Sequence, residues 1–152
     1  AVDRSAGRLK RVAANADRLG LASINALATD AAKLLEQRPQ WRESFHRILV
    51  DAPCSGLGTL ARHPDARWRV TPQSIRGLLP QQQVLLDGLL PLLAPQGVLV
   101  YATCTIHPDE NQKQIQELLK RHPSLCLHQE SQLWPDQASG GDGFYSAVLQ
   151  RA

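Results

Sequence analysis

Three carboxylates and two thiols each follow a short run of mostly apolar residues, at the point where a strand would end. They are, in chain order, Asp3, Asp30, Asp51-Ala-Pro-Cys54 and Thr103-Cys-Thr105. An activated cysteine thiolate is a nucleophile that forms covalent intermediates. A lone cysteine at a strand end is more often a small buried hydrophobe. As a group, these residues have the chemical types for nucleophilic chemistry on a bound ligand.

The segments that would position these residues read as alternating helices and strands. The chain shows buried-strand signals at residues 47–50 and 98–102, and helical patterns at 5–19, 31–38, 81–93 and 108–121. Pro108 is expected at the first position of the last helix. Residues 54–80 read as a long loop with a short helical turn, and closing strands at 125–129 and 144–150 flank a Gly-rich turn at 139–143. This order predicts an α/β fold with a parallel sheet covered on both faces.

Ligands of such sheets bind beyond the carboxyl ends of the strands, so the acids and thiols are expected at one edge. An acid after the second strand is the expected partner of a ribose hydroxyl, with a glycine-rich phosphate loop about 20 residues upstream. Here that loop would fall before residue 1, and the sequence contains no Met. We therefore expect a piece of a longer protein, cut between the first and second strands of its sheet.

Composition limits the fold and the partners. The 152 residues suit one domain, and no apolar run approaches the about 20 residues that a membrane span needs. The three cysteines form no CxxC pair, which argues against a disulfide framework or structural zinc and for a reducing, cytoplasmic setting. Residues 1–76 carry 13 Lys and Arg against 7 Asp and Glu, and residues 77–152 carry 4 against 7. The basic half fits either contact with RNA or a solvated helix face.

Longer motifs around both cysteines resemble those of RNA cytosine-5 methyltransferases that use S-adenosylmethionine, and in particular the bacterial 16S rRNA enzymes of the RsmB/Fmu/Sun type. They are Asp51-Ala-Pro-Cys-Ser-Gly56, Gly56-Leu-Gly-Thr59, Arg62-His-Pro-Asp65, Arg67-Trp68, Tyr101-Ala-Thr-Cys104, Glu110-Asn111 and Gly141-Asp-Gly-Phe144. The resemblance implies a Rossmann-like S-adenosylmethionine-dependent methyltransferase sheet, truncated before its second strand. Residues 1–152 would be the C-terminal part of the catalytic domain, without the first strand, the glycine-rich loop and the N-terminal RNA-binding domain.

The resemblance also implies an activity and roles for single residues. The activity is methylation of cytosine C5 in small-subunit rRNA through a covalent adduct at C6. Cys104 would be the nucleophile, and Cys54 would assist proton removal and product release. Asp3 would hold the ribose of S-adenosylmethionine, Asp30 would lie near its adenine, and Asp51 would face both its methionine end and the target base. The implied partner is 16S rRNA, with no metal and no membrane, and the complete protein is expected to be monomeric.

Several alternatives stay open. The two thiols could exchange roles, since DNA cytosine-5 methyltransferases use a Pro-Cys nucleophile. The chain could be a non-catalytic RNA-binding remnant, or a split fragment that needs a partner for cofactor binding. A thiol hydrolase built on Cys104 and His107 is disfavoured because no orienting acid is evident.

Four further motif residues are basic or aromatic and follow the first cysteine motif. An RNA backbone clamp with base stacking is favoured over a simple solvated loop for Arg62, His63, Arg67 and Trp68. Cys126, which lies between two leucines, is expected to be core or inert. No role is assigned to His107, His122 or His128, because their spacing is not that of metal ligands.

Overall fold

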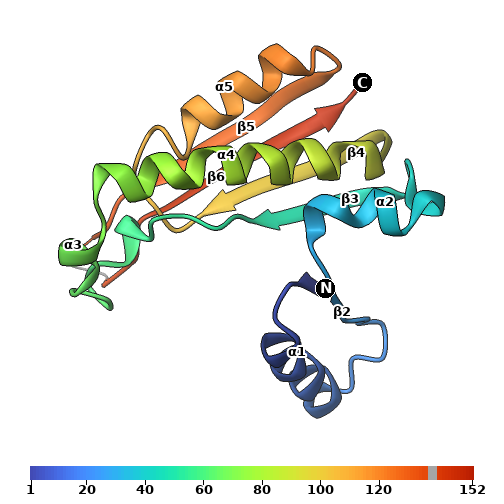
Figure 1. The fold of residues 1–152 in the computed structure, drawn as a ribbon, viewed down its shortest axis with the longest axis horizontal. Helices are drawn as coiled ribbons and strands as arrows, with labels where there is room; N and C mark the ends of the chain where they lie inside the picture. Colours follow the sequence, from blue (N-terminus) through green and yellow to red (C-terminus); the bar gives the residue numbers. More distant parts are fainter. Residues whose placement is uncertain (137–139) are drawn as a thin grey trace.

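The computed structural model describes residues 1–136 and 140–152, and its largest feature is a four-stranded sheet (Figure 1). The strands are β3 (Phe45–Asp51), β4 (Leu93–Thr103), β5 (Leu125–Leu133) and β6 (Phe144–Arg151), in the order β3-β4-β6-β5. β3 and β4 are parallel, as predicted, so both end at the same edge of the sheet. β6 is antiparallel to β4 and to β5, so the sheet is mixed, and the prediction of a parallel sheet is wrong for the closing strands.

Two helices, α4 (Pro72–Leu89) and α5 (Gln112–Arg121), lie side by side over one face of this sheet (Figure 1). On that face Leu99, Tyr101 and Leu149 are fully buried and belong to the hydrophobic core. The opposite face is more open, since Leu49 on β3 is 73% exposed. In the described part of the chain, the predicted helical cover is therefore found on one face only.

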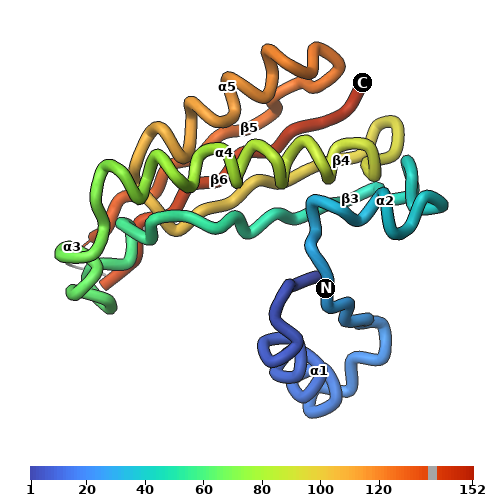
Figure 2. Tube along the Cα trace, viewed as in Figure 1, coloured from blue at the N-terminus to red at the C-terminus, as the bar shows by residue number. Residues whose placement is uncertain are grey.

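The N-terminal residues form a smaller unit beside the large sheet. β1 (Val2–Asp3) pairs in parallel with β2 (Leu27–Ala28), and α1 (Ala6–Leu19) connects the two strands and packs against them. The α1 helix begins after Ser5, whose hydroxyl accepts a hydrogen bond from the Arg8 N–H, and it ends at Gly20, which has a φ of 67°. The tube view shows that this unit projects from the rest of the molecule (Figure 2).

A short helical connection leads from this unit to the large sheet. It consists of η1 (Ala31–Lys33), α2 (Leu34–Gln37) and η2 (Pro39–Trp41). Among the described strands, β1 pairs only with β2, and β3 pairs only with β4. One cavity of about 750 Å³ is lined by residues of both β1 and β3, including Asp3 and Asp51. The free edges of β1 and β3 thus border the same open space.

The prediction of a loop over residues 54–80 is wrong for its last third, residues 72–80. After η3 (Leu57–Thr59) and α3 (Ala66–Arg69), helix α4 already begins at Pro72. Pro72 lies in the first turn of the helix, where the backbone N–H has no intrahelical acceptor, so proline costs no hydrogen bond there. Thr71 and Ser74 form a reciprocal capping box. The helix also continues past Pro80. The prolines at 72 and 80 led to a predicted helix start at residue 81, whereas the helix begins at Pro72.

Two further boundaries differ from the prediction. The helix expected to reach residue 93 ends at Leu89, followed by η4 (Leu90–Leu92), and β4 begins at Leu93. The helix expected to begin at Pro108 begins at Gln112, because residues 108–111 form turns. Pro108 is therefore outside the helix. Glu110 lies in a turn before the helix, and its side chain is buried.

Candidate functional site

The two strand-end cysteines face each other at the carboxyl edge of β3 and β4. Their Sγ atoms are 3.5 Å apart, within hydrogen-bonding distance for thiols, and both side chains are half-buried. The hydrogen bond from Cys54 lowers the pKa of Cys104 to about 7. The same hydrogen bond, together with burial, raises the pKa of Cys54. Of the two sulfurs, Cys104 is therefore the one that ionises first as the pH rises.

Asp51 is the last residue of β3 and lies near this thiol pair. The Ala52 N–H donates to the Ala102 carbonyl at 2.9 Å, so the β3–β4 hydrogen bonding continues one residue past Asp51. The hydrogen bond from Cys54 is the main influence on the pKa of Cys104, and the negative charge of Asp51 acts against it. A carboxylate and a thiolate thus share one edge, where a ligand that presents hydrogen-bond donors would relieve their repulsion.

Gly58 holds three loops of the site together. Its N–H donates to the Cys104 carbonyl at 3.0 Å, and its carbonyl accepts from the Gly143 N–H at 2.8 Å. A Cβ at position 58 would lie 2.0 Å from the Gly143 oxygen and 2.8 Å from the Cys104 oxygen, so only glycine fits. This contact also places most of the predicted Gly-rich turn beside the site, although residue 139 of that turn is outside the described residues.

Glu110 is completely buried and its side chain links the two loops that carry the cysteines. Its carboxyl oxygens accept hydrogen bonds from the Ser55 N–H at 2.8 Å and the Ser55 hydroxyl at 2.5 Å. They also accept from the Thr105 hydroxyl and the Gln82 amide, each at 3.2 Å. Ser55 follows Cys54 and Thr105 follows Cys104, so one side chain fixes the position of both thiols.

Asn111 and Tyr101 complete this buried network. The Thr103 hydroxyl donates to Asn111 Oδ1 at 2.6 Å, and Asn111 Nδ2 donates to the Thr105 carbonyl at 2.9 Å. The Tyr101 hydroxyl donates to the Glu110 carbonyl at 2.8 Å. Sequence reasoning noted Glu110-Asn111 as a motif but gave neither residue a function. The available signal was two polar residues in a turn close behind the Thr-Cys-Thr segment.

The other two predicted acids lie in the N-terminal unit and are bound by arginines. Asp3 Oδ1 accepts from Arg8 at 2.7 Å and from the Ser5 N–H at 2.7 Å, and these contacts lower the pKa of Asp3. Asp30 accepts from Arg4 at 2.9 Å and caps η1. Asp3 reaches the cavity that Asp51 also lines, whereas Asp30 is not among its lining residues. The structure thus brings Cys54, Cys104 and Asp51 together, whereas Asp3 shares only the cavity that Asp51 lines.

The four residues predicted to contact RNA follow the Cys54 loop and are all exposed. Arg62 pairs with Asp142 beside the site, and its Nε donates to Asp142 Oδ2 at 2.9 Å. The other carboxylate oxygen of Asp142 is buried and has no hydrogen-bond partner among residues 1–136 and 140–152. Trp68, on α3 between two arginines, is 83% exposed. Arg62 therefore lies close enough to Cys104 to interact with it electrostatically, while the indole of Trp68 stands out toward solvent.

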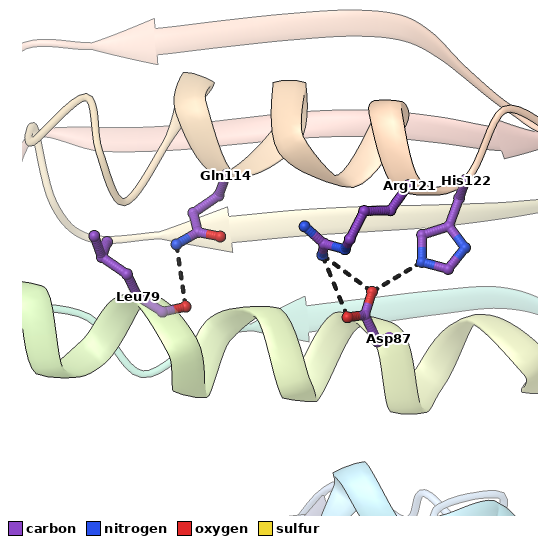
Figure 3. Close-up of polar contacts among 5 residues, drawn as sticks. All are labelled: Leu79, Asp87, Gln114, Arg121 and His122. Carbon is purple, nitrogen blue, oxygen red and sulfur yellow. Dashed lines mark hydrogen bonds and ion pairs between the residues drawn. The ribbon is translucent and has the colours of Figure 1, made fainter.

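The remaining cysteine and histidines lie apart from the thiol pair. Cys126 on β5 is exposed, so the expectation of a core position is wrong. His107 Nδ1 accepts a hydrogen bond from the Asp109 N–H at 3.3 Å, which does not support a pairing with Cys104. His122 and Arg121 both contact Asp87 where α5 meets α4, and Gln114 donates to the Leu79 carbonyl farther along the same interface (Figure 3). These contacts join the two covering helices rather than form part of the site.

The described residues contain neither a cluster of metal ligands nor a membrane-spanning helix. Within residues 1–136 and 140–152, no group of three or more His, Cys, Asp or Glu side chains could hold a metal ion. None of the helices described is long and apolar enough to cross a membrane.

Sequence comparison identifies relatives over nearly the whole chain. The family described as 16S rRNA methyltransferase RsmB/F matches residues 1–150. A probable ribosomal RNA small subunit methyltransferase B from Synechocystis is 48% identical over 120 residues, which cover 79% of this chain and 26% of that protein. Ribosomal RNA small subunit methyltransferase B from Erwinia tasmaniensis is 41% identical over 156 residues, which cover 98% of this chain and 35% of that protein. The chain thus spans between about a quarter and a third of the length of these relatives.

Solved structures share the fold. The crystal structure of PH0851 matches with a TM-score of 0.91 at 31% identity, covering 99% of this chain and 36% of that one. NSun6 from Pyrococcus horikoshii, solved with SFG, matches with a TM-score of 0.81 at 24% identity, covering 99% of this chain and 40% of that one. The mixed sheet is therefore a Rossmann-like methyltransferase sheet, and the resemblance inferred from the motifs is confirmed. The chain belongs to the 16S rRNA methyltransferase RsmB/F family.

Proposed function

We propose that this chain supplies the base-modifying part of an S-adenosylmethionine-dependent methyltransferase that acts on cytosine C5 in small-subunit rRNA. The family and the names of the relatives support an rRNA methyltransferase. The observation that carries the cytosine C5 chemistry is the pair of thiols 3.5 Å apart, with opposite shifts in acidity, beside Asp51.

The first step requires a thiolate, because cytosine C5 is a poor nucleophile. When the Cys104 thiolate adds to C6, a sulfur–carbon bond forms and electron density moves onto C5 and N3. The lowered pKa of Cys104, about 7, makes the thiolate available near neutral pH. In its protonated form, Asp51 would donate a hydrogen bond to N3 and accept one from the exocyclic amine, and so stabilise the negative charge that builds on the ring. S-adenosylmethionine, when bound, supplies the electrophilic methyl group that C5 takes.

The second thiol acts after the first has reacted. The pKa of Cys54 is raised mainly by its hydrogen bond to Cys104. Once Cys104 is bonded to C6, it no longer carries the charge that holds the Cys54 proton. The acidity of Cys54 then rises, and its thiolate can remove the C5 proton as the bond between C6 and Cys104 breaks. The order of use, Cys104 first and Cys54 second, therefore follows from their coupling.

The acids fit a ribose-bearing cofactor in part. Asp3 at the end of β1 and Asp51 at the end of β3 border one cavity of about 750 Å³, within the size range of small-molecule sites. Carboxylates in this position accept hydrogen bonds from ribose hydroxyls or an ammonium group. Asp3 already binds Arg8, and Asp30 binds Arg4, so both must share or exchange these exposed partners. The RNA would approach over Arg62, His63, Arg67 and Trp68, where basic groups adjoin an exposed indole.

Covalent trapping tests this function. The chain is mixed with S-adenosylmethionine and small-subunit rRNA that contains 5-fluorocytosine, whose C5 substituent cannot leave as a proton does. We expect an adduct on denaturing gels for the unmodified chain and for Cys126→Ala, and none for Cys104→Ala. With ordinary rRNA, Cys54→Ala should accumulate an adduct that the unmodified chain releases. An adduct that needs Cys54 and not Cys104 would reverse the two roles, and no adduct in any case would overturn the proposal.

A non-catalytic RNA-binding fragment is the second candidate, and the arginine contacts of Asp3 and Asp30 favour it. Calorimetric titration with S-adenosylmethionine separates the two. Micromolar binding by the chain supports the enzyme, whereas absent binding together with retained rRNA binding supports a fragment that needs a partner to complete its cofactor site.

A further inference from the structure

We propose that Cys54 and Cys104 form an oxidative modification site, at which hydroperoxides convert the two thiols into an intramolecular disulfide. The inference about the disulfide stands on the distance between the sulfur atoms and on their unequal acidities, and does not depend on RNA or cofactor. Only its effect on methyl transfer rests on the proposed function.

The geometry favours disulfide formation over other products. The sulfur atoms are 3.5 Å apart and must approach to about 2.05 Å to form the bond. The two loops that carry them are fixed to each other by the Gly58 hydrogen bond to Cys104 and by the contacts of Glu110 with Ser55 and Thr105. The thiols therefore stay adjacent, and a sulfenic acid formed on one of them is in contact with the other thiol, which can react with it.

The unequal acidities define the order of reaction. The Cys104 thiolate attacks one peroxide oxygen, the O–O bond breaks, and Cys104 becomes a sulfenic acid while the leaving hydroxide takes up a proton. The Cys54 sulfur then attacks the Cys104 sulfur, the S–O bond breaks, and the proton of Cys54 leaves with the departing hydroxide as water. In sum, two thiols and one hydrogen peroxide give one disulfide and two waters. The pair loses two electrons, and the peroxide gains them.

The disulfide would remove both groups that the proposed methyl transfer needs, and a dithiol reductant would restore them by exchange. Without Cys54, the sulfenic acid at Cys104 has no adjacent thiol and is open to further, irreversible oxidation. Cys54 thus has a protective function that does not depend on RNA or on cofactor.

Cys126 provides an internal comparison. It is exposed on β5, whereas the other two thiols are half-buried. If exposure alone decided oxidation, Cys126 would react first. The proposal predicts instead that the half-buried pair reacts first, because one member is a thiolate and the other is in contact with it.

The test treats the 152-residue chain with equimolar hydrogen peroxide at pH 7 and analyses its tryptic peptides. Cys54 lies in peptide 48–62, Cys104 in 77–113 and Cys126 in 122–151. We expect a cross-linked species of 48–62 with 77–113, reversed by dithiothreitol, also in a Cys126→Ser background. Cys104→Ser should lower the rate of thiol loss by about tenfold. In Cys54→Ser, the Cys104 sulfenic acid should be captured by dimedone when dimedone is present, and should be over-oxidised by excess peroxide when dimedone is absent.

Two results would overturn the proposal. One is dimedone labelling of Cys104 without cross-link while Cys54 is present. The other is oxidation of Cys126 before the pair. Because the assay reads only thiols, its outcome is independent of whether the chain methylates RNA. A cross-link with no RNA adduct would retain this inference and remove the proposed function.

Discussion

The thiol site and the acid-bearing N-terminal unit are held in place by different kinds of contact. Around the thiols, hydrogen bonds join residues far apart in the chain, such as Ser55 with Glu110 and Gly58 with Gly143, and the central carboxyl group is completely buried. In the N-terminal unit, the carboxylate of Asp3 is held by the nearby, exposed Arg8. Tertiary structure thus fixes the thiols before any ligand binds, whereas the partner of Asp3 can be exchanged at little energetic cost.

The largest effect is expected from Glu110→Ala. The change leaves the Ser55 N–H, the Thr105 hydroxyl and the Gln82 amide without their acceptor in a buried site. Unfolding in urea should show a loss of about 3 kcal/mol. Glu117→Ala on the exposed side of α5 is the control and should leave the unfolding midpoint unchanged. Equal midpoints for both variants would contradict the central position of Glu110.

Gly58→Ala should have the next largest effect. The new Cβ would meet the Gly143 carbonyl at 2.0 Å, so one of the three loops must move. We expect a destabilisation of about 2 kcal/mol and a slower reaction of Cys104 with iodoacetamide. Gly77→Ala is the matched control, since nothing lies within 4 Å of its Cβ and the site is inside α4. There the substitution should stabilise the helix slightly. Retained stability in Gly58→Ala would show that the loops are not tightly joined.

A smaller effect concerns the acidity of Cys104. Because thiolate is the reactive form, alkylation of Cys104 should increase with pH through a midpoint near 7 and then level off. Cys54→Ala removes the hydrogen bond that lowers this pKa, so the midpoint should move upward and the rate at pH 7 should fall by about tenfold. Mass spectrometry of peptide 77–113 measures the rate without interference from Cys126. A midpoint that does not move would mean that Cys54 is not the donor.

The strands that carry the thiols could be predicted from the sequence, because residues 48–50 and 98–102 are apolar throughout and end at polar residues. The start of α4 could not be predicted, since Pro72 and Pro80 suggested a loop. In the structure, the capping box of Thr71 and Ser74 stabilises a helix start at Pro72. The antiparallel pairing of β6 depends on distant partners that local sequence does not specify. The function of Glu110 was missed because residues 108–121 were expected to form a helix, and an acid in the first turn of a helix is usually exposed. Only the folded chain shows four donors converging on it.

The smallest effect on stability is expected in the N-terminal unit, from Arg8→Ala. Arg8 lowers the pKa of Asp3 mainly by hydrogen bonding, so its removal should raise that pKa toward its ordinary value, as carboxyl carbon NMR can measure. The unfolding midpoint should not change, because the pair is exposed. Arg11→Ala, on the same helix but without a contact to Asp3, is the control. If Arg8→Ala instead lowered the unfolding midpoint as much as Gly58→Ala, the N-terminal acids would be as firmly positioned as the thiols. The contrast between the two regions would then have to be abandoned.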